Sequence, residues 1–426
     1  MTKIRFQTAL ENAIQWVKQH YADLGGQPIL VRDLYGRIRI ALPIEAPTDE
    51  NAHHENLAAL FCKELGHFSH QSVFLYQDEL FDSDAIFKSP DKINISKNPH
   101  IDLLDHQLTG QDWLRQPIAS QTGIQRVTLF GIKGGVGRST ALAVWAWYLA
   151  QQGKRVLILD LDLESPGVGQ TLLPKSYVPD FGIIDWLVEE AVEQADESLL
   201  RELVSTSPLL ASSGSGDIRI VPASGTQEKD YIAKLSRIYM DLSGADFAER
   251  LSRLLHALEK QEKPDIVLLD SRAGIHDIAA ITITRLNAYA LLFAINTPQT
   301  WGAYRLLFQH WQRWHPNLAQ FRDNLKIVAS MVPEIDRANY LEGCRQSAYD
   351  LFADTLYEET SNEDEFNFDE KAKEAPHYPL KFYWHRAFQE FDPVSNSEIF
   401  NENSVLEAYG SFLKEITSLA LRNQVF

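Results

Sequence analysis

The segment that most constrains the fold lies at residues 126–150, where an apolar run, a glycine-rich loop and an alanine-rich run follow one another. The run at 126–130 has the composition of a buried strand, and the run at 141–150 that of a helix. Between them, residues 131–140 read Gly-Ile-Lys-Gly-Gly-Val-Gly-Arg-Ser-Thr. Glycines let successive backbone N–H groups point at an anion, and a helix N-terminus adds partial positive charge. The sequence therefore predicts a phosphate-binding loop in which Ser139 can ligate Mg²⁺.

The rest of the chain after residue 124 alternates between strand and helix patterns. Its apolar runs are nearly continuous, as expected of parallel strands that are buried on both faces. The clearest of them lie at residues 155–160, 217–222, 265–270, 288–295 and 325–332. This alternation predicts an α/β domain with a doubly wound, mostly parallel sheet.

A separate small domain is expected before this sheet. Residues 1–100 show short helix and strand patterns, which predict an α+β fold, and they contain no motif that points to chemistry. Residues 101–123 are polar and irregular, so we expect a linker there. The large domain would then span residues 124–426, and the small domain would bind a partner.

The charge balance argues against a surface built for polyanions. The chain has 58 acidic residues against 40 lysines and arginines, a net charge of −18. Nonspecific DNA and anionic lipid attract basic surfaces, so nucleic acid is a possible but not a favoured partner, and a membrane is not expected. The aromatic residues at 301–321 could stack on bases, but their helical spacing favours a buried face. Two distant cysteines, Cys62 and Cys344, suit a reducing cytoplasm.

The glycine loop resembles the deviant K-G-G-x-G-K-[ST] loop of the ParA/MinD family of ATPases. The positions that fit are Lys133, Gly134, Gly135, Val136, Gly137, Ser139 and Thr140. Arg138 stands where that family has a second lysine. The resemblance implies that this loop binds ATP, with Lys133 reaching the phosphates of a partner subunit. Arginine keeps the charge and can fork onto phosphate oxygens, but it is larger and planar, so we expect slow hydrolysis.

Two acidic segments extend the resemblance. Asp160 and Asp162 end an apolar run and match the family's D-x-D segment, which implies that Asp162 orients the attacking water and reaches Mg²⁺. Asp270 matches the family's Walker B acid, a further Mg²⁺ ligand, although Arg272 replaces its proline. Arg272 could act as an arginine finger, but a surface position or a pair with Asp277 is the favoured interpretation. The alternative for the segment of Asp160 and Asp162 is a strand that ends with ordinary solvated acids.

These patterns together predict an ATP- and Mg²⁺-dependent switch ATPase that dimerises, hydrolyses ATP slowly and controls a partner protein. Its catalytic residues would be Lys133, Asp162 and Arg138, and its metal ligands Ser139, Asp162 and Asp270. Ser330 replaces an asparagine that commonly reads adenine in the family, which leaves GTP open. The alternatives are a nucleotide-binding scaffold without hydrolysis and a DNA-associated ATPase of the partitioning type.

Overall fold

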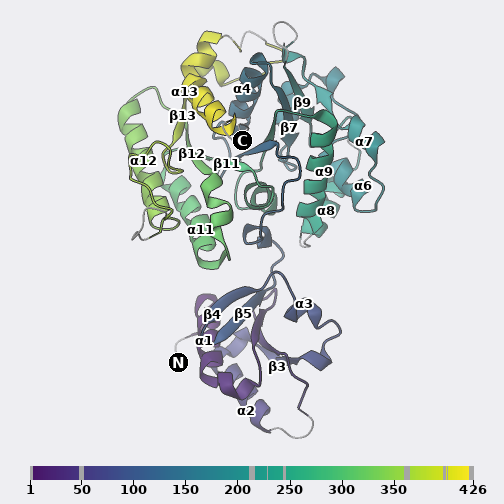
Figure 1. Cartoon of the computed structure of the whole chain (residues 1–426), viewed down its shortest axis with the longest axis vertical. Helices are drawn as coiled ribbons and strands as arrows, with labels where there is room; N and C mark the ends of the chain where they lie inside the picture. Colours follow the sequence, from purple (N-terminus) through teal and green to yellow (C-terminus); the bar gives the residue numbers. More distant parts are fainter. Residues whose placement is uncertain are drawn as a thin grey trace. The chain divides into compact units, whose positions relative to one another are not determined.

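The computed structural model describes residues 3–47, 52–210, 216–227, 229–242, 246–358, 365–396, 400 and 402–421. The chain divides into two compact units, Met1–Gln111 and Asp112–Phe426, which are described separately below (Figure 1). The first unit therefore extends beyond the expected boundary at residue 100. Residues 101–105 were expected at the start of a linker, but they belong to a strand, His100–Asp105, whose Ile101, Leu103 and Leu104 are buried.

In the described residues, the first unit holds a five-stranded sheet in the order β3-β2-β1-β5-β4. β1 pairs in parallel with β5 and antiparallel with β2, so this sheet is mixed. Trp16 and Phe61, on different helices, meet at 5.0 Å between ring centroids in the unit's core. The elements are α1 (Phe6–His20), β1 (Ile29–Arg32), β2 (Ile38–Leu42), α2 (Ala52–Leu65), β3 (Ser69–Tyr76), α3 (Asp84–Phe87), β4 (Ile93–Lys97) and β5 (His100–Asp105).

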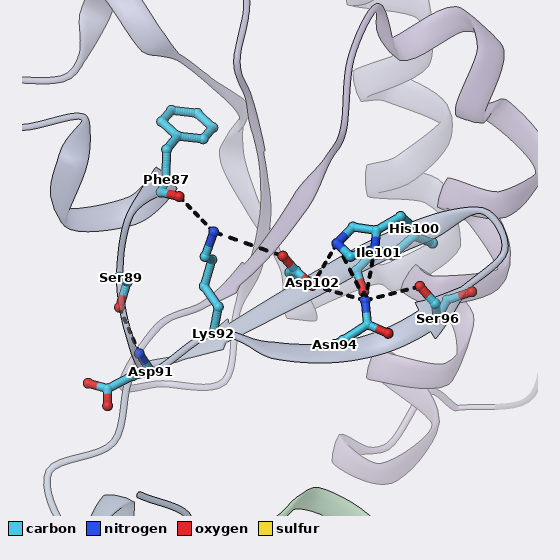
Figure 2. A network of polar contacts seen from close by, with 9 residues as sticks. All are labelled: Phe87, Ser89, Asp91, Lys92, Asn94, Ser96, His100, Ile101 and Asp102. Carbon is cyan, nitrogen blue, oxygen red and sulfur yellow. Dashed lines mark hydrogen bonds and ion pairs between the residues drawn. The ribbon is translucent and has the colours of Figure 1, made fainter. Parts of the chain in front are cut away.

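A polar network fixes the β4–β5 hairpin at one edge of this sheet (Figure 2). The Asn94 amide donates hydrogen bonds to Asp102 Oδ1 at 3.0 Å and to the carbonyl oxygen of Ser96 at 3.2 Å. His100 Nε2 lies 3.2 Å from the same Asp102 oxygen. Polar side chains that bond within the hairpin protect an exposed edge strand from pairing with other chains. We interpret this network as structural.

In the described residues, the second unit holds an eight-stranded sheet in the order β13-β12-β11-β6-β10-β7-β9-β8. Every pairing in it is parallel except the one between β8 and β9, which confirms the predicted doubly wound, mostly parallel sheet. The strands are β6 (Gln125–Gly131), β7 (Arg155–Asp160), β8 (Ser205–Thr206), β9 (Asp217–Val221), β10 (Ile266–Asp270), β11 (Tyr289–Ala294), β12 (Leu325–Val332) and β13 (Leu380–Tyr383).

Helices cover both faces of the large sheet, as Figure 1 shows. One face packs against α4 and α13, and the other packs against α6, α9, α11 and α12. The helices are α4 (Arg138–Gln151), α5 (Val168–Leu172), α6 (Ile183–Glu190), α7 (Glu197–Glu202), α8 (Tyr231–Leu242), α9 (Asp246–Glu262), α10 (Asp277–Ala280), the π-helix η7 (Ile281–Arg285), α11 (Pro298–Trp314), α12 (Arg337–Ala353) and α13 (Glu402–Leu421).

The helix that follows the glycine loop is buried almost all round. The sheet lies on one side of α4, and α13 covers the other, where Trp145 Nε1 donates a hydrogen bond to Thr417 Oγ1 at 3.0 Å. This double burial explains why the sequence of α4 is apolar without a polar face. Tyr304, Phe308 and Trp311 on α11 are fully buried, as their spacing predicted. None of the helices in the described ranges combines the length and the apolar character that a membrane crossing requires.

Candidate functional site at the end of the central strands

The predicted phosphate loop connects β6 to α4 at the middle of the large sheet. Gly135 and Gly137 have φ angles of +72° and +75°, a conformation that strains residues with a side chain. A Cβ atom on Gly131 would lie 2.9 Å from the carbonyl oxygen of Lys133 and from Val136 Cγ2, so this position also requires glycine. The glycines therefore allow a tight loop that ends at a helix N-terminus, the usual geometry of an anion site.

Two buried side chains hold this loop in place. Val136 is 3% exposed and inserts into the core between the sheet and α4. The Ile132 N–H donates to Tyr304 Oη at 3.4 Å, and that hydroxyl donates to the carbonyl oxygen of Phe293 at 2.9 Å. In contrast, Lys133, Gly134 and Gly135 are exposed. The loop thus combines an anchored base with an accessible tip.

The predicted acidic residues meet beside the loop. Asp160 and Asp270 end β7 and β10 and are direct partners in the parallel register. Ser139, in the first turn of α4, donates its hydroxyl to Asp270 Oδ2 at 2.7 Å. Asp162 follows β7 and reaches the same place through Arg138. The structure therefore brings Ser139, Asp162 and Asp270 together, at the carboxyl ends of parallel strands where α/β proteins bind ligands.

Arg138 lies between the two carboxylates. Its Nε donates to Asp270 Oδ1 at 2.7 Å, and its Nη2 donates to Asp162 Oδ2 at 3.1 Å. The side chains of Arg138, Asp162 and Asp270 are 10%, 13% and 1% exposed. Burial opposes the charge on Arg138, but Asp270 and Asp162 outweigh burial and raise its pKa. Burial raises the pKa of Asp162 despite the nearby guanidinium.

The position of Arg138 differs from the expectation that it would fork onto phosphate oxygens. Its side chain extends across the site to acids on two strands instead. The physical reason is that two largely buried carboxylates require a cation or hydrogen-bond donors nearby. The spacing in the sequence could not indicate this contact, because 132 residues separate Arg138 from Asp270.

Asp160 organises the segment that follows β7. Its carboxylate accepts hydrogen bonds from the N–H groups of Gly167 at 3.1 Å, Gly169 at 3.3 Å and Asp162 at 3.3 Å. Complete burial and the charge of Asp270 raise the pKa of Asp160 to about 7. Asp160 therefore holds the backbone of Asp162 and of the segment after it in place.

A second cluster joins the segments that follow β7 and β10, and the sequence did not reveal it. Glu164 accepts hydrogen bonds from Tyr239 of α8 and forms an ion pair with Arg272. His276 Nε2 lies 3.8 Å from Glu164 Oε1. Arg272 thus pairs with Glu164, where a surface position or a pair with a local acid such as Asp277 was expected. Glu164 lies two residues from Asp162, and Arg272 two residues from Asp270, so this cluster fixes both acidic segments to each other.

Only part of the expected metal site consists of protein carboxylates. Within the described ranges, no group of three or more His, Cys, Asp or Glu side chains could hold a metal ion. The candidate ligands are two carboxylates and the Ser139 hydroxyl, a small set of oxygen donors. Mg²⁺ usually binds to one or two carboxylates together with water and substrate phosphates, so this donor set suits it.

Comparison with known proteins supports the class of this site. Residues 127–289 match the family described as the CobQ/CobB/MinD/ParA nucleotide binding domain, so the match begins in β6 and ends at β11. The resemblance predicted from the loop is thereby confirmed: this part of the chain matches nucleotide-binding domains of the ParA/MinD type.

Individual proteins are more distant. The antiactivator FleN of Pseudomonas aeruginosa is 28% identical over 194 residues, which are 45% of this chain and 58% of FleN. The match thus spans less than two thirds of that relative. A ParA family ATPase from Chlorobium tepidum is 17% identical with a TM-score of 0.44, covering 70% of this chain and 99% of that one. The pNOB8 ParA protein bound to nonspecific DNA is 18% identical with a TM-score of 0.41, covering 70% and 98%.

Proposed function

We propose that this protein is an ATP- and Mg²⁺-dependent switch that hydrolyses ATP slowly, dimerises when ATP is bound and controls a partner protein. The observation that carries this proposal is the meeting of Ser139, Asp162 and Asp270 beside an anchored glycine loop. The match of residues 127–289 to a nucleotide binding domain supports the ligand class. A cytoplasmic location is part of the proposal.

The backbone of the loop and the first turn of α4 would bind the triphosphate. The N–H groups of residues 134–139 and the hydroxyls of Ser139 and Thr140 are the groups in this segment that can donate to phosphate oxygens. Ser139, Asp162 and Asp270 would hold Mg²⁺, which neutralises charge on the phosphates when it is bound. Asp162 would also orient the attacking water. Lys133 is exposed and is available to the phosphates of a second subunit.

The first unit would recognise the partner protein. In the described residues it forms its own sheet and core. FleN is described as an antiactivator, which supports control of another protein as the kind of output. Because the match leaves much of FleN uncovered, the partner of this chain has to be found by experiment.

Phosphate release from purified protein tests the enzymatic part of the proposal. With saturating ATP and Mg²⁺, we expect slow release that falls to the background rate in Asp162→Ala, while ATP binding changes little. Asp84→Ala, an exposed carboxylate on α3, is the matched control and should retain the full rate. Normal turnover in Asp162→Ala would contradict the assigned role.

One observation favours the non-hydrolysing alternative. Arg138 occupies the space between Asp162 and Asp270, and a chain that keeps it there would bind nucleotide without assembling the hydrolytic site. ATP binding with no phosphate release from the unmodified protein, with or without Mg²⁺, would identify this alternative.

A further inference from the structure

The most unusual feature of the site is that a side chain of the loop itself supplies the cation for the two acids. Arg138 is the first residue of α4, directly after Gly137. From there its guanidinium contacts Asp270 at the end of β10 and Asp162 after β7. Ser139 donates to the other oxygen of Asp270. Of the three candidate metal ligands, Asp162 and Asp270 therefore contact Arg138 directly, and Ser139 is connected to it through Asp270.

We propose that Arg138 is a resident counter-ion that keeps divalent cations out of this site until nucleotide is bound. This inference rests on the proposed function, because it concerns the regulation of the same site. In the protein without nucleotide, the guanidinium satisfies the carboxylates that a metal ion would need. When the triphosphate arrives, its oxygens compete for Arg138 and release Asp162 and Asp270 for Mg²⁺.

The chemistry of arginine explains why it suits this role. A guanidinium has several donors in one plane and can contact two carboxylates at once, whereas a lysine ammonium acts as a point charge. Here the two contacts come from different nitrogen atoms, Nε and Nη2, and go to acids on different strands. Arginine also forms strong, often bidentate contacts with phosphate oxygens, so the same side chain can move from carboxylates to a bound nucleotide.

Burial makes the contact stable enough to act as a block. The arginine is 10% exposed and Asp270 is 1% exposed, so water screens this charge pair weakly. Breaking a buried pair by removing one partner is strongly destabilising, because it leaves an uncompensated charge. Removing Arg138 should therefore destabilise the protein and create a site that a divalent cation can neutralise.

The test compares Arg138→Met with Arg126→Met, both without nucleotide. Arg126 forms an equivalent buried pair with Glu259, at 2.6 and 2.9 Å, away from the loop. We expect each variant to lower the Tm by roughly 5 °C or more. We take 10 mM MgCl₂ as about ten times the dissociation constant of Mg²⁺ for Arg138→Met, and this concentration should raise the Tm of that variant by about 3 °C. It should shift the unmodified protein and Arg126→Met by no more than NaCl of equal ionic strength does.

The absence of a specific Mg²⁺ shift in Arg138→Met would overturn the inference. If that variant does not fold, electron paramagnetic resonance measures Mn²⁺ binding to the unmodified protein instead, and this binding tests the inference. We expect Mn²⁺ to stay free in the absence of ATP, and stoichiometric binding without ATP would refute the block. Calorimetry with ATP separates the two proposals. If the unmodified protein does not bind ATP, the proposed function is wrong. If the unmodified protein binds ATP but Mg²⁺ does not raise the Tm of Arg138→Met, only this inference is wrong.

Discussion

Buried acids near the loop are stabilised in two different ways. Asp160 accepts hydrogen bonds from three backbone N–H groups, including those of Gly167 and Gly169. Asp162 and Asp270 instead share one guanidinium, that of Arg138. Backbone donors cannot leave without unfolding the segment, whereas a side chain can rotate. The charge that can be exchanged for a metal ion is therefore confined to Asp162 and Asp270.

A second buried residue, His315, makes the stability of the large unit depend on pH. It ends α11, and its Nδ1 accepts a hydrogen bond from the Asn317 N–H at 3.1 Å. Burial lowers the pKa of His315 to about 4, against 6.5 for the ordinary side chain. Between these values the unfolded chain binds a proton that the folded chain does not, so stability is lost as the pH falls from 6.5 towards 4.

The pH dependence can be measured with His315→Asn, which removes the titration and keeps a hydrogen-bond acceptor. Between pH 7 and pH 5 the unmodified protein should lose about 2 kcal/mol more than the variant in the free energy of unfolding. Urea unfolding at the two pH values measures this difference. The exposed His53, replaced by Asn, is the matched control for the loss of a histidine side chain. Equal losses in His315→Asn and the unmodified protein would contradict the argument.

At the scale of elements, the site depends on two segments that follow neighbouring strands. Asp270 ends β10 and Asp162 follows β7, and Glu164 joins the two following segments by its ion pair with Arg272. Tyr239 of α8 donates to the same carboxylate. Because α8 packs against the adjacent helices α6 and α9, the cluster around Glu164 attaches the segments after β7 and β10 to the rest of the unit. A nucleotide that moves either segment must strain this cluster.

Tyr239→Phe tests that coupling without changing the ring. The variant loses the hydrogen bond that the hydroxyl donates to Glu164 and the long one, 3.5 Å, that it accepts from Arg272. A loss of about 1 kcal/mol should let both segments open more readily. We expect amide hydrogen exchange at residues 161–167 and 271–276 to speed up roughly fivefold. Tyr35→Phe, an exposed ring in the first unit, should have no effect there. Unchanged exchange in both segments of Tyr239→Phe would show that Glu164 does not hold them together.

The strands and the loop were predictable because their signals are local. Continuous apolar runs such as Ile266–Asp270 indicate buried parallel strands, and glycines mark the loop. The contacts of Arg138 and Glu164 were not predictable, because each crosses between elements far apart in the sequence. Residues 101–105 of β5 were expected in a linker because the stretch around them is polar and irregular. Its burial comes from pairing with β1, which no local pattern indicates.

At the scale of the whole molecule, the second unit begins with a segment tied to the region after β10. Asp112 accepts a hydrogen bond from Arg285 Nη1 at 2.7 Å, and its carbonyl oxygen accepts from Thr284 Oγ1 at 2.8 Å. The Ile118 N–H donates to the carbonyl oxygen of Arg285 at 2.7 Å. Thr284 and Arg285 belong to the π-helix η7, which follows Asp270 and α10 along the chain. Movement after β10 is thus connected to the start of this unit.

Dimerisation is the other property that belongs to the whole molecule. Lys133 lies at the exposed tip of the loop, and if it serves a second subunit, Lys133→Ala should weaken the ATP-dependent dimer more than ATP binding itself. Sedimentation velocity with saturating ATP should give a dimer for the unmodified protein and mostly monomer for the variant. Lys175→Ala removes another exposed lysine and should dimerise normally. A full dimer in Lys133→Ala would refute this role.

We expect the segment between β6 and α4 to bind a nucleoside triphosphate, and titration calorimetry with ATP and Mg²⁺ measures this binding. One binding site per chain is expected. It also predicts loss of binding in Gly137→Val, because a Cβ atom there would lie 3.3 Å from Met331 and Phe382 at a φ of +75°. Gly302→Val, at an open position on α11, should bind normally. A folded, unmodified protein that gives no heat with ATP would contradict the account.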